Sequence, residues 1–159
     1  MANTFSSVYI HIIFAVKNRN ALIPPHWQPR IWAYIANILK EKGHIPVSIG
    51  GTSDHVHILF KYKITELLPD LVRDIKIASG KFIDSVRITP FKFFWQSGYG
   101  CFSYGASQVE AVKNYIDNQT THHKGRTLRE EIISYLDRCG IEYDEKYLFE
   151  DISSTPTGS

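Results

Sequence analysis

Two histidines separated by one apolar residue, His55 and His57, are the first candidates for chemistry in this sequence. They lie in the segment 53–60, where apolar and polar side chains alternate, and this alternation predicts a β-strand with both histidines on one face. Alternate residues of a strand lie about 6.5–7 Å apart at Cα, so both imidazoles can reach a single metal ion. The pair is also typical of the polar face of an ordinary strand, and the residues alone leave both interpretations open.

Tyr115 and Gln119 form a second candidate group, in a segment that predicts a helix over 107–123. Residues four apart on a helix are neighbours on one face, with Cβ atoms about 5–6 Å apart. Tyr115 lies at the edge of the apolar stripe of this helix, so its other interpretation is a half-buried aromatic residue. For Gln119 the other interpretation is a solvated surface amide.

These candidates must be positioned by a fold, and the sequence predicts an α+β domain with an antiparallel sheet of four to five strands and helices packed on it. Pro29 suits the first turn of a helix, Gly43 suits the position after its end, and residues 107–110 and 127–130 have the pattern of capping boxes. The predicted strands cover 5–16, 45–50, 53–60, 91–95 and 101–104, and the predicted helices cover 29–42, 69–85, 107–123 and 127–139.

Length and composition limit the class of protein. With 159 residues, 43% of them hydrophobic, the chain predicts one domain with a single core. No run approaches the roughly 18 apolar residues of a membrane span, and the N-terminus lacks a signal pattern, so we expect no membrane partner. The two cysteines, Cys101 and Cys139, lack metal-type spacing, and we expect them to be reduced in a cytoplasmic protein.

Charge is distributed unevenly along the chain. Residues 1–100 carry 12 Lys and Arg against 6 Asp and Glu, a local charge of +6, whereas residues 101–159 carry 6 against 10, a local charge of −4. A basic body followed by an acidic part fits a polyanion-binding surface on the first 100 residues. An ordinary solvated surface would give the same counts, so charge alone does not decide the function.

Three motifs in a fixed order carry a resemblance to a known family. They are His55-Val56-His57, Trp95-Gln96-Ser97-Gly98-Tyr99-Gly100 and the run from Tyr115 to His123. The set resembles the single-tyrosine transposases of the HUH nuclease superfamily, small proteins of single-stranded-DNA insertion sequences and their REP-associated relatives. The resemblance implies a ferredoxin- or RRM-like HUH nuclease domain over 1–125, with 126–159 as an attached C-terminal helix and acidic tail.

The resemblance also implies a role for each candidate residue. His55, His57 and Gln119 would be the protein ligands of Mg²⁺ or Mn²⁺, a set of imidazole and oxygen donors that suits a hard divalent ion. Tyr115 would attack the scissile phosphate, giving a 5′-phosphotyrosine and a released 3′-OH, and reversal of this step would join new DNA ends. No nucleotide cofactor is needed, in agreement with the absence of a phosphate-binding glycine loop.

Family members bind hairpins of single-stranded DNA near element ends as homodimers in the bacterial or archaeal cytoplasm, associated with the nucleoid, so we expect the same partners here. Candidate phosphate contacts come from the first turn and the second helix, although a solvated helix face would look the same. His122 is a weaker candidate, because a histidine near a helix C-terminus also interacts with the helix dipole. His11 is expected to be a satisfied sheet residue. The phosphate candidates are Lys17, Arg19, Arg73, Lys76, Ser79 and Lys81.

Two other functions fit the same residues. A domesticated relative would bind DNA hairpins without moving them. A metal-dependent phosphodiesterase would use water as the nucleophile, and Tyr115 would then be only a core residue.

Overall fold

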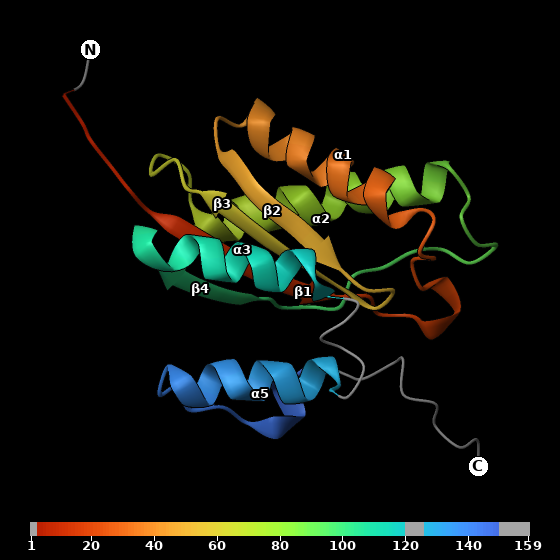
Figure 1. The fold of residues 1–159 in the computed structure, drawn as a ribbon. Coiled ribbons are helices and arrows are strands. Elements are labelled where there is room, and N and C mark those ends of the chain that lie inside the picture. Colours follow the sequence, from red (N-terminus) through yellow and green to blue (C-terminus); the bar gives the residue numbers. More distant parts are fainter. Residues whose placement is uncertain (1–2, 120–125, 150–159) are drawn as a thin grey trace.

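A four-stranded antiparallel sheet forms the centre of the computed structural model, which describes residues 3–119 and 126–149 (Figure 1). This is the predicted α+β class. The strands lie in the order β2-β3-β1-β4, with bounds β1 Tyr9–Ala15, β2 Ile45–Gly51, β3 His55–Lys61 and β4 Gly100–Tyr104. The helices are α1 Gln28–Glu41, α2 Leu68–Ser85, α3 Val109–Asp117 and α5 Leu128–Arg138, with short 3-10 turns at 19–21, 106–108 and 145–147. None of the described helices is long and apolar enough to cross a membrane.

The two central strands divide the core into two faces. On one face Phe14 contacts α2, since the Lys76 ammonium lies 5.3 Å from its ring centroid, and α1 stacks on α2 through Tyr34 and Phe82. On the other face the ring of His57 contacts α3, and the ring of His11 contacts α5. The sheet therefore lies between two helix pairs, and the predicted histidine face is the one that α3 and α5 cover (Figure 1).

The predicted strand over 91–95 is wrong. Within it only Trp95 makes a β-bridge, to Val16. The edge of β1 is already occupied by β4, which pairs with Tyr9 through Ile13. Only the last residues of β1 are left for the 91–95 segment, so it makes a single bridge instead of a ladder.

The predicted helix over 107–123 is shorter than expected. After a 3-10 turn at 106–108, α3 begins at Val109 and ends at Asp117. Asn118 adopts φ −108° and ψ 25°, and its side-chain amide donates to the carbonyl of Asn114 at 2.7 Å, which competes with continuation of the helix. Gln119 follows this break, and residues 120–125, with the candidate His122, lie outside the described residues.

The C-terminal helix α5 begins as predicted, because the Thr127 hydroxyl accepts the backbone N–H of Glu130 at 3.1 Å. Its buried residues, at i, i+3, i+4 and i+7, are Leu128, Glu131, Ile132 and Tyr135. The three apolar members belong to the same hydrophobic core as the sheet. A buried glutamate among them is the one residue of this stripe that hydrophobic burial does not explain.

Candidate functional site

His55 and His57 are fully buried on the face that α3 and α5 cover, and hydrogen bonds fix the orientation of both rings. His55 Nδ1 lies 2.7 Å from the Asp54 carboxylate, which can only accept, so Nδ1 carries the proton and Nε2 presents a lone pair. His57 Nδ1 lies 2.8 Å from Nε2 of His11. The two Nε2 atoms thus point toward α3 and α5.

His11 completes the support of His57. Burial, followed by electrostatic interaction with His57, lowers the pKa of His11, so this imidazole is neutral and its Nε2 can accept a hydrogen bond from His57 Nδ1–H. Its Nδ1 lies 3.3 Å from the hydroxyl of Tyr104 on β4. His11 is therefore a hydrogen-bonded sheet residue, as expected, and it sets the tautomer in which His57 Nε2 presents a lone pair.

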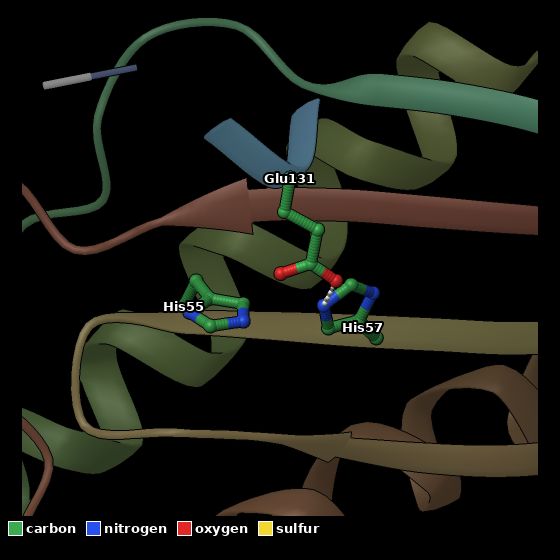
Figure 2. A group of neighbouring side chains, drawn as sticks. All are labelled: His55, His57 and Glu131. Carbon is green, nitrogen blue, oxygen red and sulfur yellow. Dashed lines mark ion pairs between the residues drawn. The ribbon is translucent and has the colours of Figure 1, made fainter. Parts of the chain in front are cut away.

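Gln119 and Glu131 bring oxygen atoms to these two nitrogens. The Gln119 Oε1 atom lies 3.1 Å from His55 Nε2, and the Glu131 Oε1 atom lies 3.3 Å from His57 Nε2. Figure 2 shows Glu131 reaching from α5 toward the two imidazoles of β3. One ligand atom from each of His55, His57 and Glu131 lies within 4.8 Å of the others.

This donor set fits a divalent cation. Because both Nδ1 atoms act as donors, the Nε2 atoms of His55 and His57 each present a lone pair. Each of these lone pairs faces an oxygen of Gln119 or Glu131 that also carries lone pairs. Two facing acceptors do not attract each other, but both attract a cation. Neighbouring ligands with bonds of about 2.1 Å lie about 3 Å apart, close to the two separations above. The carboxylate of Glu131, only 3% exposed, would offset part of the cation's charge.

Tyr115 lies against the same cluster. Its ring centroid is 6.0 Å from that of His57, and its hydroxyl donates to Glu131. Burial raises the pKa of the Tyr115 hydroxyl, and the hydrogen bond and negative charge of Glu131 raise it further. In this state the phenol is protonated, and the Glu131 carboxylate accepts its hydrogen bond.

Sequence reasoning missed Glu131. It was counted only as one of the acidic residues of the C-terminal part, although the stripe that begins at the predicted capping residue Thr127 and Leu128 places residue 131 on the inner face. An acidic residue at an inward position of an amphipathic helix is the signal that could have identified it, because charged side chains are rarely buried without a specific partner.

A hollow of about 270 Å³ opens beside the cluster, lined by Ile116, Asp117 and Gln119 on one side and by the β2 glycines Gly50 and Gly51 on another. A Cβ atom at residue 50 would lie 2.6 Å from the carbonyl oxygen of Ile116. Only glycine at this position lets α3 approach β2 so closely, and this approach carries Tyr115 and Gln119 to the histidines.

The predicted phosphate contacts do not form one group. Lys17 and Arg19 are exposed beside Phe94 in the turn after β1. Arg73 and Lys81 are exposed on α2, and Arg73 pairs with Asp70 and Asp74 of the same helix.

Two of the predicted contacts form hydrogen bonds within the fold. Ser79 is fully buried, where its hydroxyl donates to Ile75 and accepts the indole N–H of Trp95, so it does not reach a DNA phosphate at the surface. The Lys76 ammonium donates to the carbonyls of Gln96 and Gly98, at 2.9 and 2.7 Å. Burial lowers the pKa of Lys76, and its charge anchors the 96–98 loop.

Comparison with known proteins gives one family and two similar folds. A family model described as IS200-like transposase matches residues 4–119. A proposed transposase from Deinococcus radiodurans R1 has a similar structure, with a TM-score of 0.59 and 21% identity over 75% of this chain and 95% of that one. A REP-associated tyrosine transposase bound to a REP hairpin has a TM-score of 0.54 and 11% identity over 100% of this chain and 96% of that one. The search of curated proteins gave no match.

Proposed function

Because the chain belongs to the IS200-like transposase family, we propose that it cleaves and rejoins single-stranded DNA at insertion-sequence ends through a covalent bond between Tyr115 and a DNA 5′-phosphate. The observation that supports this most is that a tyrosine hydroxyl, a carboxylate and two oriented imidazoles meet in one buried cluster. A family neighbour is bound to a REP hairpin, and we propose a DNA hairpin as the partner of this chain as well.

We further propose that His55, His57, Gln119 and Glu131 hold a divalent metal, Mg²⁺ or Mn²⁺. Two imidazole nitrogens favour Mn²⁺ over Mg²⁺, which prefers oxygen ligands alone. When bound, the metal supplies Lewis-acid polarisation of the scissile phosphate and stabilises the negative charge that develops there.

We propose separate roles in the reaction for the other residues of the site. The Tyr115 oxygen forms a bond to phosphorus while the bond from phosphorus to the 3′ oxygen breaks. The tyrosine proton passes to the Glu131 carboxylate, which already accepts it in a hydrogen bond, and the departing 3′ oxygen takes up a proton to leave as a 3′-OH. The raised pKa of Tyr115 makes this acceptor necessary, because few phenolate groups form at neutral pH without one. His11 and Asp54 keep the two imidazoles in the required orientation.

The direct test is a covalent adduct. Single-stranded hairpin oligonucleotides incubated with the protein and Mn²⁺ should give a denaturation-resistant protein–DNA species on a gel. Tyr115→Phe should abolish this species and leave DNA binding within about two-fold, because the substitution removes the attacking oxygen and keeps the ring. Tyr147→Phe is the control, since Tyr147 is 80% exposed, and the adduct should persist in this variant.

Water as the nucleophile is the second candidate mechanism, and the raised pKa of Tyr115 favours it. The same experiment separates the two. Cleavage by the Tyr115→Phe variant without an adduct would assign the protein as a metal-dependent phosphodiesterase. Hairpin binding without any cleavage by the unaltered protein would assign it as a domesticated binding relative.

A further inference from the structure

An exposed phenylalanine flanked by cations lies at one end of the sheet. Phe94 is 47% exposed, and the ammonium groups of Lys17 and Lys92 lie 6.0 and 5.3 Å from its ring centroid. Lys17, Asn18, Arg19 and Phe94 line a shallow hollow of about 460 Å³. We refer to Lys17, Arg19, Lys92 and Phe94 as the Phe94 patch.

Backbone pairing places the Phe94 patch on the face of the sheet that carries the histidines. Val16 bridges Trp95, with Lys17 N–H donating to the Phe94 carbonyl at 2.9 Å. The Trp95 side chain packs against Phe14 on the opposite face, with ring centroids 4.7 Å apart. Because side chains alternate along an extended segment, Phe94 and Lys17 point to the histidine face.

The patch is also close to the histidines along the strand. Ala15 is the register partner of His55, and Lys17 follows it by two residues, or about 7 Å. A DNA strand that presents a phosphate to Tyr115 and His55 therefore has its neighbouring nucleotides within reach of the Phe94 ring, since consecutive nucleotides are separated by about the same distance.

We propose that Phe94 is a stacking platform for one unpaired base of the bound DNA strand, and that Lys17, Arg19 and Lys92 bind the phosphates on either side of that base. This inference rests on the proposed function, because single-stranded DNA is its ligand. An exposed aromatic ring stacks on any base, whereas a base inside a duplex has both faces covered by its neighbours. Phenylalanine offers no hydrogen bond, so the platform selects unpaired DNA without reading its sequence.

The charge around the ring supports DNA as the occupant. The hollow is lined by two cations, one amide and the ring itself, which complements a phosphate backbone with a base between its phosphates. A second aromatic residue, Phe91, provides a matched control. It is 51% exposed and lines a separate hollow at the end of α2, where the Asp84 carboxylate accompanies Arg87 and Lys92.

The test measures binding of the full-length protein to a short single strand containing 2-aminopurine, without metal, so that no cleavage occurs. Phe94→Ala should weaken binding about 5- to 100-fold and reduce the fluorescence quenching that stacking causes. Phe94→Trp should restore both signals, and Phe91→Ala should bind like the unaltered protein. Equal affinities for the Phe94→Ala and Phe91→Ala variants would overturn the proposal.

The salt dependence of binding and the affinity for duplex DNA distinguish the contribution of the Phe94 ring from that of the lysines. Lys17→Ala or Lys92→Ala should each reduce the slope of log affinity against log salt concentration by about 0.7, whereas Phe94→Ala should leave this slope unchanged. Phe94→Ala should also leave the affinity for a blunt duplex unchanged. An equal loss of affinity on duplex and single strand would contradict stacking on an unpaired base.

The outcome is independent of the covalent chemistry. An adduct in the unaltered protein together with full binding by Phe94→Ala would refute the platform and keep the transposase mechanism. Weakened binding by Phe94→Ala without any adduct in the unaltered protein would keep the platform and refute the mechanism.

Discussion

At the scale of single residues, the site depends on hydrogen-bond partners that determine which nitrogen of each histidine carries the proton. Asp54 and His11 each engage the Nδ1 atom of one histidine on β3, and both Nε2 atoms therefore face the oxygens of Gln119 and Glu131. Each of these supports is buried, so water does not compete for the hydrogen bonds. In the proposed metal site, these supporting side chains would therefore orient the ligands.

Glu131 is expected to contribute to metal affinity. Glu131→Gln keeps the size and one oxygen but removes the negative charge, so Mn²⁺ should bind about 10-fold more weakly, since ligand charge tunes the affinity for hard cations. Titration calorimetry or the electron paramagnetic resonance of Mn²⁺ measures this without any activity assay. Glu130→Gln, one residue earlier and exposed, is the control. Unchanged Mn²⁺ affinity in Glu131→Gln would restrict Glu131 to the proton transfer from Tyr115.

Lys76 is expected to stabilise the fold rather than bind DNA. Lys76→Met should lower the free energy of unfolding by about 1–3 kcal/mol, because the carbonyls of Gln96 and Gly98 lose a charged donor. Denaturant unfolding measures this, with the exposed Lys81→Met on the same helix as the control. A normal stability combined with a reduced salt slope for DNA binding would instead make Lys76 a phosphate contact.

At the scale of elements, the decisive contact is that of α3 with β2. Tyr115 and Gln119 reach the histidines because the backbone of α3 approaches β2 at Gly50. The helix then ends at Asp117, and Gln119 follows the break at Asn118. Helical spacing predicted that these two residues share one face, but the structure brings them together across the end of the helix.

Gly50→Ala tests this approach. The added methyl group would meet the Ile116 carbonyl, so α3 must shift or the core must expand, at a cost of about 1–3 kcal/mol in the free energy of unfolding. Adduct formation should fall by more than the stability loss explains, since Tyr115 moves with α3. Gly80→Ala in α2 is the control, because a Cβ atom there meets nothing within 4 Å, and it should stabilise the protein by about 0.5–1 kcal/mol.

At the scale of the whole molecule, one chain contains every group of the proposed site. The sheet supplies His55 and His57, α3 supplies Tyr115, and α5 supplies Glu131. The apolar side chains of α5 belong to the same hydrophobic core as the sheet. We therefore expect the proposed chemistry to take place within a single chain, whether or not the protein dimerises.

Mixing two inactive variants tests this conclusion. Tyr115→Phe retains the histidines and His57→Ala retains the tyrosine, so if sites were shared between subunits, one of the two sites in every mixed dimer would be rebuilt. With the site within one chain, the mixture should form no adduct above the level of either variant alone. Recovery of the adduct after co-refolding would show that α3 serves the partner subunit, as the resemblance to homodimeric family members allows. Co-purification of two differently tagged variants confirms that mixed dimers are present.

The sequence by itself determined the elements whose pattern is local. The alternation around His55 and His57, the helices that begin near Pro29 and after Thr127, and the α+β class all follow from periodicity and capping residues that act within a few positions. The order of the three motifs carried the resemblance to the family, which the match over residues 4–119 confirms.

Only the tertiary structure decided the contacts between elements that are far apart in the chain. Glu131 enters the site because the stripe of α5 packs on the sheet, Ser79 leaves the predicted DNA surface because Trp95 covers it, and β4 excludes the 91–95 segment from the edge of β1. Glutamate and serine are ordinary surface residues, and the partners that bury Glu131 and Ser79 come from segments far away in the sequence, so local spacing does not identify those partners.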